Sequence, residues 1–140
     1  MKKEFRKFSL KTFTGKGYTL TPVEFKDISP FEVKRMYYIT HFEPVVQTGE
    51  HCHKIEEEVF IQAEGSSVAI IDRGQGKEEI ALTEGEALYV PNYVWHGFKD
   101  PSVDCTIIAL SSTNYTSDRS DYVENYEEYV TFRDEKLSES

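Results

Sequence analysis

Four histidines occur in the chain, and two of them, His51 and His53, stand only one residue apart. In a β-strand, successive side chains point to opposite faces, so both imidazoles would share one face and Cys52 would take the other. Histidine titrates near neutral pH and is also a common metal ligand. Together with the carboxylate of Glu58 and the imidazole of His96, the pair could therefore transfer protons or hold a metal ion.

The metal interpretation follows from residue types alone. Three histidines and one carboxylate form a ligand set that suits Fe(II), Mn(II), Ni(II) or Zn(II). It predicts a metal-dependent enzyme of the dioxygenase type, with ligands His51, His53, Glu58 and His96. In the alternative interpretation the histidines act without a metal, and Glu58 forms a hydrogen bond with one imidazole and fixes its tautomer.

Short strands must position these groups. Turn signals recur about every 8 to 12 residues along most of the chain, which is typical of an all-β sandwich or barrel. No dozen-residue helical pattern separates the strands, so a parallel sheet with crossover helices is not expected. We predict antiparallel strands over residues 8–13, 18–25, 31–40, 58–64, 68–72, 78–82, 87–90 and 106–110.

The strand predicted over residues 31–40 places Arg35 and Tyr37 on one face, among apolar side chains. A guanidinium and a phenol in that position indicate a barrel interior that carries polar groups. The alternative is that Arg35 lies on a wet outer face of the sheet.

The composition changes near the C-terminus. We predict a short helix over about 119–131, capped by Asp118 or Ser120, with tyrosines on the face that packs against the barrel. The charged residues 134–140 are expected to fray. Because the sequence contains no repeat or linker, we predict one domain over residues 1–140.

Charge and composition exclude several classes of partner. The formal net charge of −9 argues against nucleic acid or an anionic membrane as the main partner. No stretch approaches the roughly 20 apolar residues of a membrane span, and no apolar run of a secretory signal follows the first residues. We therefore expect a cytoplasmic protein. The cysteines Cys52 and Cys105 do not form a disulfide framework, and we expect a structural role for Cys52.

Two spaced motifs carry a resemblance to a known fold family. They read His51-x-His53-x4-Glu58-x6-Gly65 and Gly85-x5-Pro91-Asn92-Tyr93-Val94-Trp95-His96. They resemble the signature motifs of the cupin superfamily, small antiparallel β-barrels of the jelly-roll type whose interior holds the chemistry. The second motif departs from the pattern at Tyr93, where the family has glycine.

Further motifs occur in a fixed order along the chain. They are Lys34-Arg35-Met36-Tyr37-Tyr38-Ile39, His51-x-His53-Lys54, Val94-Trp95-His96 and Asp121-Tyr122-Val123-x-x-Tyr126. Together they resemble the WxcM-like dTDP-4-keto-6-deoxyhexose 3,4-ketoisomerases. The chain departs from that family at Thr48-Gly49-Glu50, where Arg-Gly-x is usual, at Glu58, where Gln is common, and at Gly97-Phe98.

The resemblance implies a homodimeric β-barrel that works without a cofactor. Such an enzyme moves a carbonyl from C4 to C3 of dTDP-4-keto-6-deoxy-D-glucose, a dTDP-linked 4-keto-6-deoxy sugar. The product is a dTDP-3-keto-6-deoxyhexose that feeds the biosynthesis of 3-amino sugars for surface glycans. By resemblance, residues 20–24 favour the gluco over the galacto configuration of the product.

The resemblance places His51, His53 and Tyr37 in the pocket. Moving the ketone requires a base that titrates near neutral pH to take the C3 proton, and donors aimed at the enediolate oxygen. We assign proton abstraction to one of the two histidines, with Tyr37 and the other histidine as donor or shuttle. The sequence leaves the order of the pair open.

Five residues are candidates for substrate binding. Arg35 is the candidate for the diphosphate, because its planar fork can grip phosphate oxygens in a bidentate manner. Lys54 is secondary, since alternation turns it away from the histidines, and His96 is a further contact. Trp95 and Tyr93 either stack on the thymine or pack within the barrel.

Two other functions share the same fold. A non-catalytic sugar-binding or regulatory cupin would need no base. A dTDP-sugar 3,5-epimerase would share the barrel and the ligand, but it requires two opposed acid–base groups.

Overall fold

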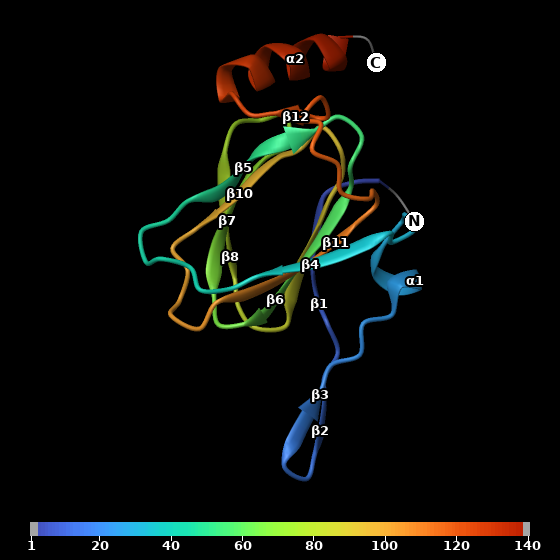
Figure 1. Cartoon of the computed structure of the whole chain (residues 1–140), viewed down its shortest axis with the longest axis vertical. Helices are drawn as coiled ribbons and strands as arrows, with labels where there is room; N and C mark the ends of the chain where they lie inside the picture. The colour runs from blue at the N-terminus through green and yellow to red at the C-terminus, as the bar shows by residue number, and fades with distance from the viewer. Residues whose placement is uncertain (1–2, 139–140) are drawn as a thin grey trace.

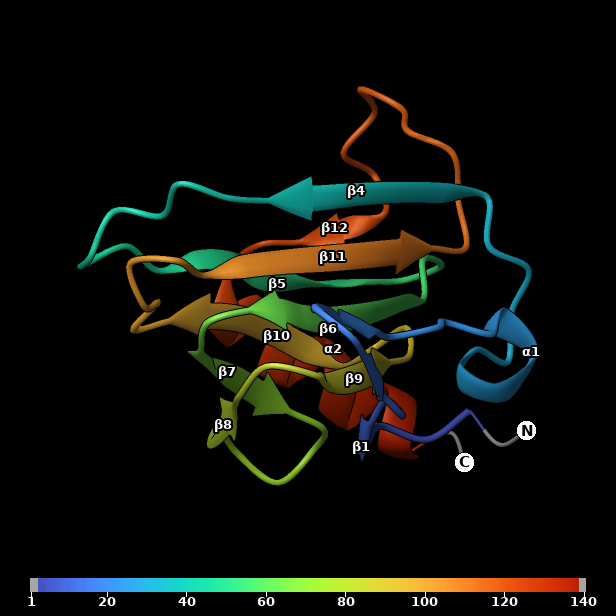
Figure 2. The same ribbon diagram turned by 90° about the horizontal axis from the view of Figure 1, so that it is seen from below.

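Within residues 3–138, which the computed structural model describes, two five-stranded antiparallel sheets face each other and form a jelly roll (Figure 1). The first sheet has the order β1 (Arg6–Ser9), β9 (Glu86–Val90), β6 (Glu58–Glu64), β11 (Thr106–Ser111) and β4 (Arg35–Ile39). The second has the order β12 (Tyr122–Val123), β5 (Thr48–His53), β10 (Trp95–Lys99), β7 (Ser67–Asp72) and β8 (Glu78–Leu82). Figure 2 shows the strands of the first sheet in this order, from β4 to β1. The predicted all-β class is confirmed.

Alternation along β4 decides which side chains face the interior. Arg35 and Tyr37 turn toward the space between the sheets, while Met36 and Tyr38 are exposed on the outer face. The predicted shared face of Arg35 and Tyr37 is confirmed, so the interior of the jelly roll carries polar groups.

Apolar side chains fill part of the space between the sheets. The buried members of this core are Phe60, Ala69, Ile71, Leu82, Leu88, Val90, Val94, Phe98, Cys105, Ile107 and Ala109. The ring centroid of Phe60 lies 5.4 Å from that of His96, so the apolar core forms the floor under the histidines. A second cluster of buried apolar residues includes Val59 and Ile61 of β6 and packs against the N-terminal segment.

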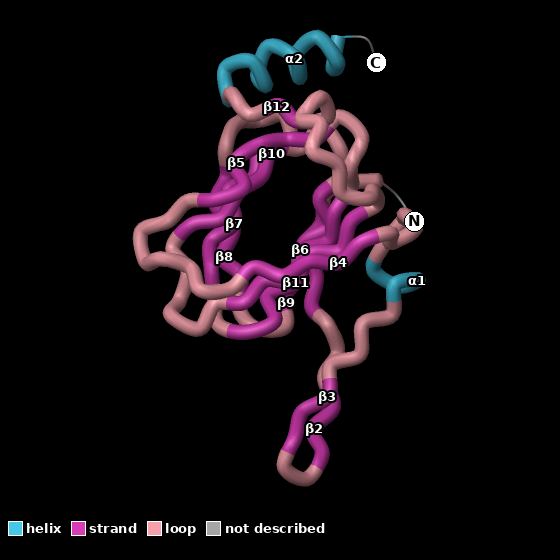
Figure 3. Tube along the Cα trace, in the orientation of Figure 1, coloured by secondary structure: helices cyan, strands magenta, loops and turns pink. Residues whose placement is uncertain are grey.

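A two-stranded hairpin stands off the sheets (Figures 1 and 3). Its strands, β2 (Phe13–Gly15) and β3 (Tyr18–Leu20), pair in an antiparallel manner. Gly17 in the connecting turn has φ +85°, a conformation that glycine adopts without a clash of a Cβ atom. The chain therefore reverses direction at this glycine, between the two strands.

Three predicted strands are too long, and the one predicted over 31–40 is observed only as β4, from Arg35 to Ile39. The strand predicted over 8–13 splits into the end of β1 and the start of β2. The strand predicted over 18–25 stops with β3, before Pro22, which has no N–H to donate to a neighbouring strand. One helical turn, α1 (Phe25–Ile28), follows.

The C-terminal helix predicted over about 119–131 is wrong at both ends, because α2 spans Tyr126–Ser138. The preceding residues pair with the edge of β5 as β12, so long-range strand pairing replaces the first helical turns. Asn125 caps the helix in place of either predicted residue, and its Oδ1 accepts an N–H of the first turn at 3.0 Å. The tail predicted to fray is helical through Ser138, and its last two residues lie outside the described residues.

Helix α2 is fastened to the outside of the second sheet (Figure 1). Tyr129 is buried against Trp95, with ring centroids 5.4 Å apart. The buried carboxylate of Asp72 accepts hydrogen bonds from the Tyr126 hydroxyl at 2.6 Å and from Arg133 Nη1 at 2.8 and 3.0 Å. These contacts fix the C-terminal segment that carries β12.

Cys52 and Cys105 are both buried and free. Cys52 lies in the apolar cluster under α2, on the face of β5 opposite the imidazoles, which agrees with the structural role expected for it. Within the described part of the chain, neither helix combines the length and the apolar character needed to cross a membrane.

Candidate active site

A cavity of about 440 Å³, lined by charged, polar and aromatic residues, opens between the sheets where β4, β5 and β12 come together. Its lining residues are Arg35, Tyr37, His51, His53, Glu56, Tyr115 and Tyr122. Strands β4 and β5 supply the first four, the turn after β5 supplies Glu56, and the segment after β11 supplies the two tyrosines. The cavity therefore draws on both sheets and on the C-terminal segment.

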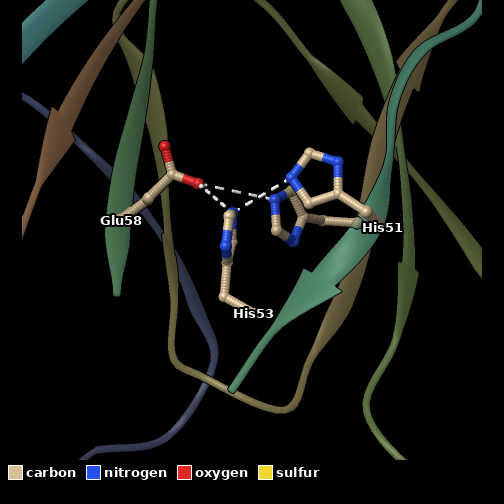
Figure 4. Close-up of side chains that lie close together, drawn as sticks. His51, His53 and Glu58 are labelled. Atoms are coloured by element: carbon tan, nitrogen blue, oxygen red, sulfur yellow. Dashed lines mark hydrogen bonds and ion pairs between the residues drawn. The ribbon is translucent and has the colours of Figure 1, made fainter. Parts of the chain in front are cut away.

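Strand pairing brings three histidines together. His51 and His53 face the same side of β5, as predicted, and His96 on β10 is the cross-strand partner of His51. Ring centroids are 4.6 Å apart for His51 and His53, and 4.7 Å apart for His51 and His96. Glu58, at the start of β6 in the opposite sheet, directs its carboxylate at them (Figure 4).

Carboxylates surround His53 at both of its ring nitrogens. Nδ1 lies 3.0 Å from Asp121 Oδ2, and Nε2 lies 2.9 Å from Glu56 Oε2 and 3.3 Å from Glu58 Oε1. Burial by itself lowers the pKa of this imidazole, but the hydrogen bonds and negative charges of Glu56 and Glu58 outweigh burial and raise the pKa to about 10. His53 is therefore a buried imidazolium at neutral pH.

His51 has the opposite environment. Burial, and then the neighbouring imidazoles of His96 and His53, lower its pKa to about 2. Its Nε2 lies 3.0 Å from Nε2 of His53, so the lone pair of a neutral ring faces the N–H of a charged one. The neutral ring of His51 lines the cavity.

Tyr37 donates its hydroxyl hydrogen to Glu58 Oε2. Burial, and then the charge of Glu58, raise the pKa of Tyr37 far above its usual value, so the hydroxyl stays protonated. For Glu58, burial raises the pKa, but the hydrogen bond from His53 and the proximity of His96 at 3.6 Å outweigh burial and hold the pKa well below its usual value. Glu58 is thus an anion held between a phenol and two imidazoles.

Glu56 joins the arginine of β4 to the charged imidazole. Its Oε1 accepts hydrogen bonds from Arg35 Nη2 and Ser111 Oγ, both at 2.6 Å, and from Thr113 Oγ1 at 2.8 Å. Its Oε2 contacts His53. Arg35 therefore lies in the cavity wall, where it is partly exposed and forms an ion pair with the buried carboxylate of Glu56.

The same residues have the geometry of a metal-binding group. His51, His53, Glu58 and His96 each offer one ligand atom, and these atoms all lie within 4.8 Å of one another. Imidazole and carboxylate ligands suit several divalent transition metals. Asp121 at Nδ1 of His53 is also the kind of outer contact that orients a metal-bound imidazole.

Several residues predicted to bind substrate lie outside the cavity lining. Lys54 is exposed in the turn after β5. Trp95 is buried against tyrosine rings of α2, because alternation along β10 turns it away from the neighbouring His96, which is itself buried behind the cavity. Tyr93 has φ +68° and packs 5.4 Å from an aromatic ring of α2. Trp95 thus packs under α2, the second of its two interpretations, whereas Tyr93 is partly exposed and lies outside the lining of this cavity.

Sequence reasoning misses other residues that the structure brings to the site: Glu56, Tyr115, Asp121 and Tyr122. Asp121 and Tyr122 belong to a motif visible in the sequence, but the sequence pattern assigns them to a helix. Glu56 stands in a run of three glutamates, which ordinarily indicates a solvated surface. All three are buried, and each has its own partners.

A jelly roll that turns three histidines and a carboxylate into its interior defines the cupin class of proteins. The family model described as FdtA: WxcM-like, C-terminal matches residues 3–134 of the chain. The TDP-4-oxo-6-deoxy-alpha-D-glucose-3,4-oxoisomerase of Aneurinibacillus thermoaerophilus is 36% identical over 123 residues, which are 87% of this chain and 86% of that relative.

Two crystal structures of QdtA, a sugar 3,4-ketoisomerase from Thermoanaerobacterium thermosaccharolyticum, are similar to the chain over almost its whole length. The complex with TDP has a TM-score of 0.85 and 30% identity, and the match covers 94% of this chain and 96% of that one. A histidine-to-asparagine mutant in complex with TDP-4-keto-6-deoxyglucose has a TM-score of 0.86 and 29% identity, with 97% and 98% covered. The chain belongs to the FdtA, WxcM-like family, and it is an isomerase of the 3,4-ketoisomerase kind.

The charge of His53 predicts how stability depends on pH. A pKa raised from 6.5 to about 10 on folding stabilises the protein fully below about pH 6.5, and this stabilisation is lost as the pH rises through about 10. Urea titration measures the free energy of unfolding at each pH. Between these limits we expect it to fall more steeply with pH in the wild type than in His53→Gln, and the two slopes should differ by up to about 1.4 kcal/mol per pH unit. His41→Gln, a change at an exposed histidine, should keep the wild-type dependence. Equal slopes for wild type and His53→Gln would contradict the assignment.

Proposed function

We propose that the chain converts dTDP-4-keto-6-deoxy-D-glucose into a dTDP-3-keto-6-deoxyhexose by proton transfer between C3 and C4. The observation that carries the proposal is the pair formed by a neutral His51 and a charged His53 in one cavity wall. The relative from A. thermoaerophilus is named for TDP-4-oxo-6-deoxyglucose, and the QdtA mutant was crystallised with TDP-4-keto-6-deoxyglucose. Both names support this choice of substrate.

His51 is the base in this proposal. Its neutral ring lines the cavity, and in this proposal its Nε2 lone pair turns from His53 to the sugar and takes the proton from C3. The electrons of the C3–H bond then form a C3=C4 double bond, and negative charge develops on O4. The pKa of His51 rises as this charge appears beside it, because a nearby anion favours the protonated imidazole.

His53 and Tyr37 stabilise the enediolate. The carboxylate of Glu58 holds the imidazolium and the phenol beside the cavity, and in this proposal each turns its N–H or O–H from the carboxylate to the oxyanion when the sugar is bound. A proton passes from O3 to O4 through one of these groups, and His51 returns its proton to C4. The carbonyl is left at C3, and atoms and electrons balance without an external oxidant.

Arg35 and Tyr115 are the proposed contacts for the nucleotide. Arg35 supplies a guanidinium to the cavity wall, and in this proposal it faces the diphosphate while Nη2 stays with Glu56. Tyr115 replaces Trp95 as the candidate for the thymine, because its exposed ring lines the cavity with the Arg35 Cζ atom 5.9 Å from its centroid.

The product has a C3 carbonyl, which is the group that an aminotransferase needs to make a 3-amino sugar. This chemistry supports a place in the synthesis of amino sugars for surface glycans. We propose the gluco configuration at C4, which NMR of the product distinguishes from galacto.

The assignment of the base predicts the effect of His51→Asn. Asparagine keeps much of the shape and hydrogen bonding but cannot transfer the proton, so turnover should fall at least about 100-fold. Incorporation of solvent deuterium at C3 and C4 should fall equally, while the affinity for dTDP, measured by calorimetry, stays within about threefold. The exposed His41→Asn is the matched control.

Two results would contradict this proposal in different ways. Normal deuterium exchange in His51→Asn would show that another group is the base. Binding of the substrate by the wild type without any exchange would instead identify a non-catalytic sugar-binding protein.

A metal-dependent cupin enzyme is the second candidate, favoured by the convergence of the four ligand atoms described above. We expect exhaustive treatment with a chelator to leave isomerase activity unchanged, because His51, His53 and Tyr37 supply the base and the donors. Metal content is measured by mass spectrometry alongside activity. Activity that vanishes with the chelator and returns with Fe(II), Mn(II) or Zn(II) would make the metal enzyme the correct function.

We also propose that the enzyme is a homodimer. The hairpin of β2 and β3 stands off the barrel (Figure 1). Its side chains Phe13, Tyr18 and Leu20 are each more than half exposed. A two-stranded hairpin is marginally stable in water by itself, and an exposed apolar patch is typical of an interface. A second copy of the chain would cover these side chains.

Light scattering at micromolar concentration is expected to give twice the mass of one chain. Replacing both Tyr18 and Leu20 by lysine should shift the mass toward the monomer, because it places charges in the patch that the dimer would bury. Val103→Lys changes an exposed apolar residue on a different loop and should leave the dimer intact. A monomeric wild type would rule out the dimer without affecting the chemistry.

A further inference from the structure

The carboxylate of Asp121 lies against the end of β5, outside the steps proposed so far. Its Oδ2 lies 3.0 Å from Nδ1 of His53, and its Oδ1 accepts the backbone N–H of Ile55 at 2.6 Å. The backbone oxygen of Asp121 accepts the N–H of Lys54 at 2.9 Å. One residue therefore contacts both the imidazole and the turn that follows it.

That turn also carries Glu56, the second partner of the His53 imidazole. The backbone N–H of Glu56 also points to Asp121 Oδ2, at 3.4 Å, and the Glu56 carboxylate returns to Nε2 of His53 at 2.9 Å. Asp121 thus fixes one ring nitrogen directly. Through the turn, it also fixes the group that contacts the other nitrogen.

The segment that carries Asp121 is held in place on both sides. The next two residues form β12 and pair with His53 and Cys52 on β5. Beyond them, α2 is fastened to the sheet through the buried Asp72. A carboxylate on such a supported segment is suited to set the orientation of an imidazole, as outer partners of functional histidines do.

We propose that Asp121 is a positioning residue for the isomerase reaction. It holds His53 with Nδ1 protonated, so that Nε2 is the nitrogen that faces His51 and the cavity. It acts through His53 rather than on the sugar. The expected effect on kcat rests on the proposed function. The protonation of Nδ1 in the His53 ring does not, because it is a property of the protein without substrate.

The substitution Asp121→Asn tests this role because Oδ1 accepts the shortest backbone contact, from Ile55 N–H at 2.6 Å, while Oδ2 lies 3.0 Å from His53 Nδ1 and only 3.4 Å from the Glu56 nitrogen. An asparagine has one oxygen and one NH2, so it cannot accept from both His53 Nδ1–H and Ile55 N–H. A backbone N–H cannot lose its proton, whereas an imidazole nitrogen can. The amide NH2 should therefore face His53 and force Nδ1 to give up its proton.

We expect kcat to fall about 10- to 100-fold in Asp121→Asn, with KM and the affinity for dTDP little changed. In ¹⁵N NMR spectra of the imidazole, Nδ1 of His53 should be protonated in the wild type and unprotonated in the variant. Glu124→Gln makes the same chemical change at an exposed carboxylate of the same segment, and it should leave both readouts at their wild-type values.

An unchanged kcat together with an unchanged Nδ1 signal in Asp121→Asn would overturn the proposal. A wild-type His53 without a proton on Nδ1 would overturn it too, and that measurement requires only the folded wild-type protein. If the wild type turns over no dTDP-sugar, the proposed function fails, while the two NMR spectra still decide whether Asp121 sets the state of the ring.

Discussion

The site depends on one buried ion cluster, in which the imidazolium of His53 lies between the carboxylates of Asp121, Glu56 and Glu58. A carboxylate removed from water destabilises a protein unless it is paired and hydrogen-bonded. Here each carboxylate has the imidazolium as a partner, and donors from β4, β11 and the backbone complete its hydrogen bonds. Removing one partner would leave another buried charge unpaired, so the geometry of the cluster is tightly specified.

The jelly roll makes this cluster possible because it brings together groups that are distant along the chain. Strand β6 belongs to one sheet and β5 to the other, and β12 returns from the C-terminal segment to pair with β5. The apolar core beneath the histidines excludes water from one side, which strengthens every electrostatic contact above it. Helix α2 contributes at a distance, since it secures the segment that supplies Asp121.

His51 and His53 lie only one residue apart, but in this environment the first is neutral and the second is positively charged. The carboxylates of Glu56 and Glu58 raise the pKa of His53 against the effect of burial, whereas burial beside other imidazoles lowers that of His51. Environments that push two pKa values apart assign acid and base roles to otherwise identical groups. One of these histidines, His53, also belongs to the group of side chains that has the ligand pattern of a metal cupin. The cluster requires a cation, and a protonated imidazole meets the same electrostatic requirement as a bound ion.

The sequence by itself determined the all-β class, the shared inward face of β4, the shared face of the two histidines on β5 and the family motifs. These features depend on local turn chemistry and on the period of two along a strand, which a short stretch of sequence contains. Only the tertiary structure decided that Glu56 and Asp121 are partners of His53, that Trp95 packs under α2, and that β12 replaces the start of a helix. Pairing with β5 overrides the local helical pattern. The charge states of the histidines likewise depend on groups that approach only when the chain has folded, because burial and neighbouring charges set them.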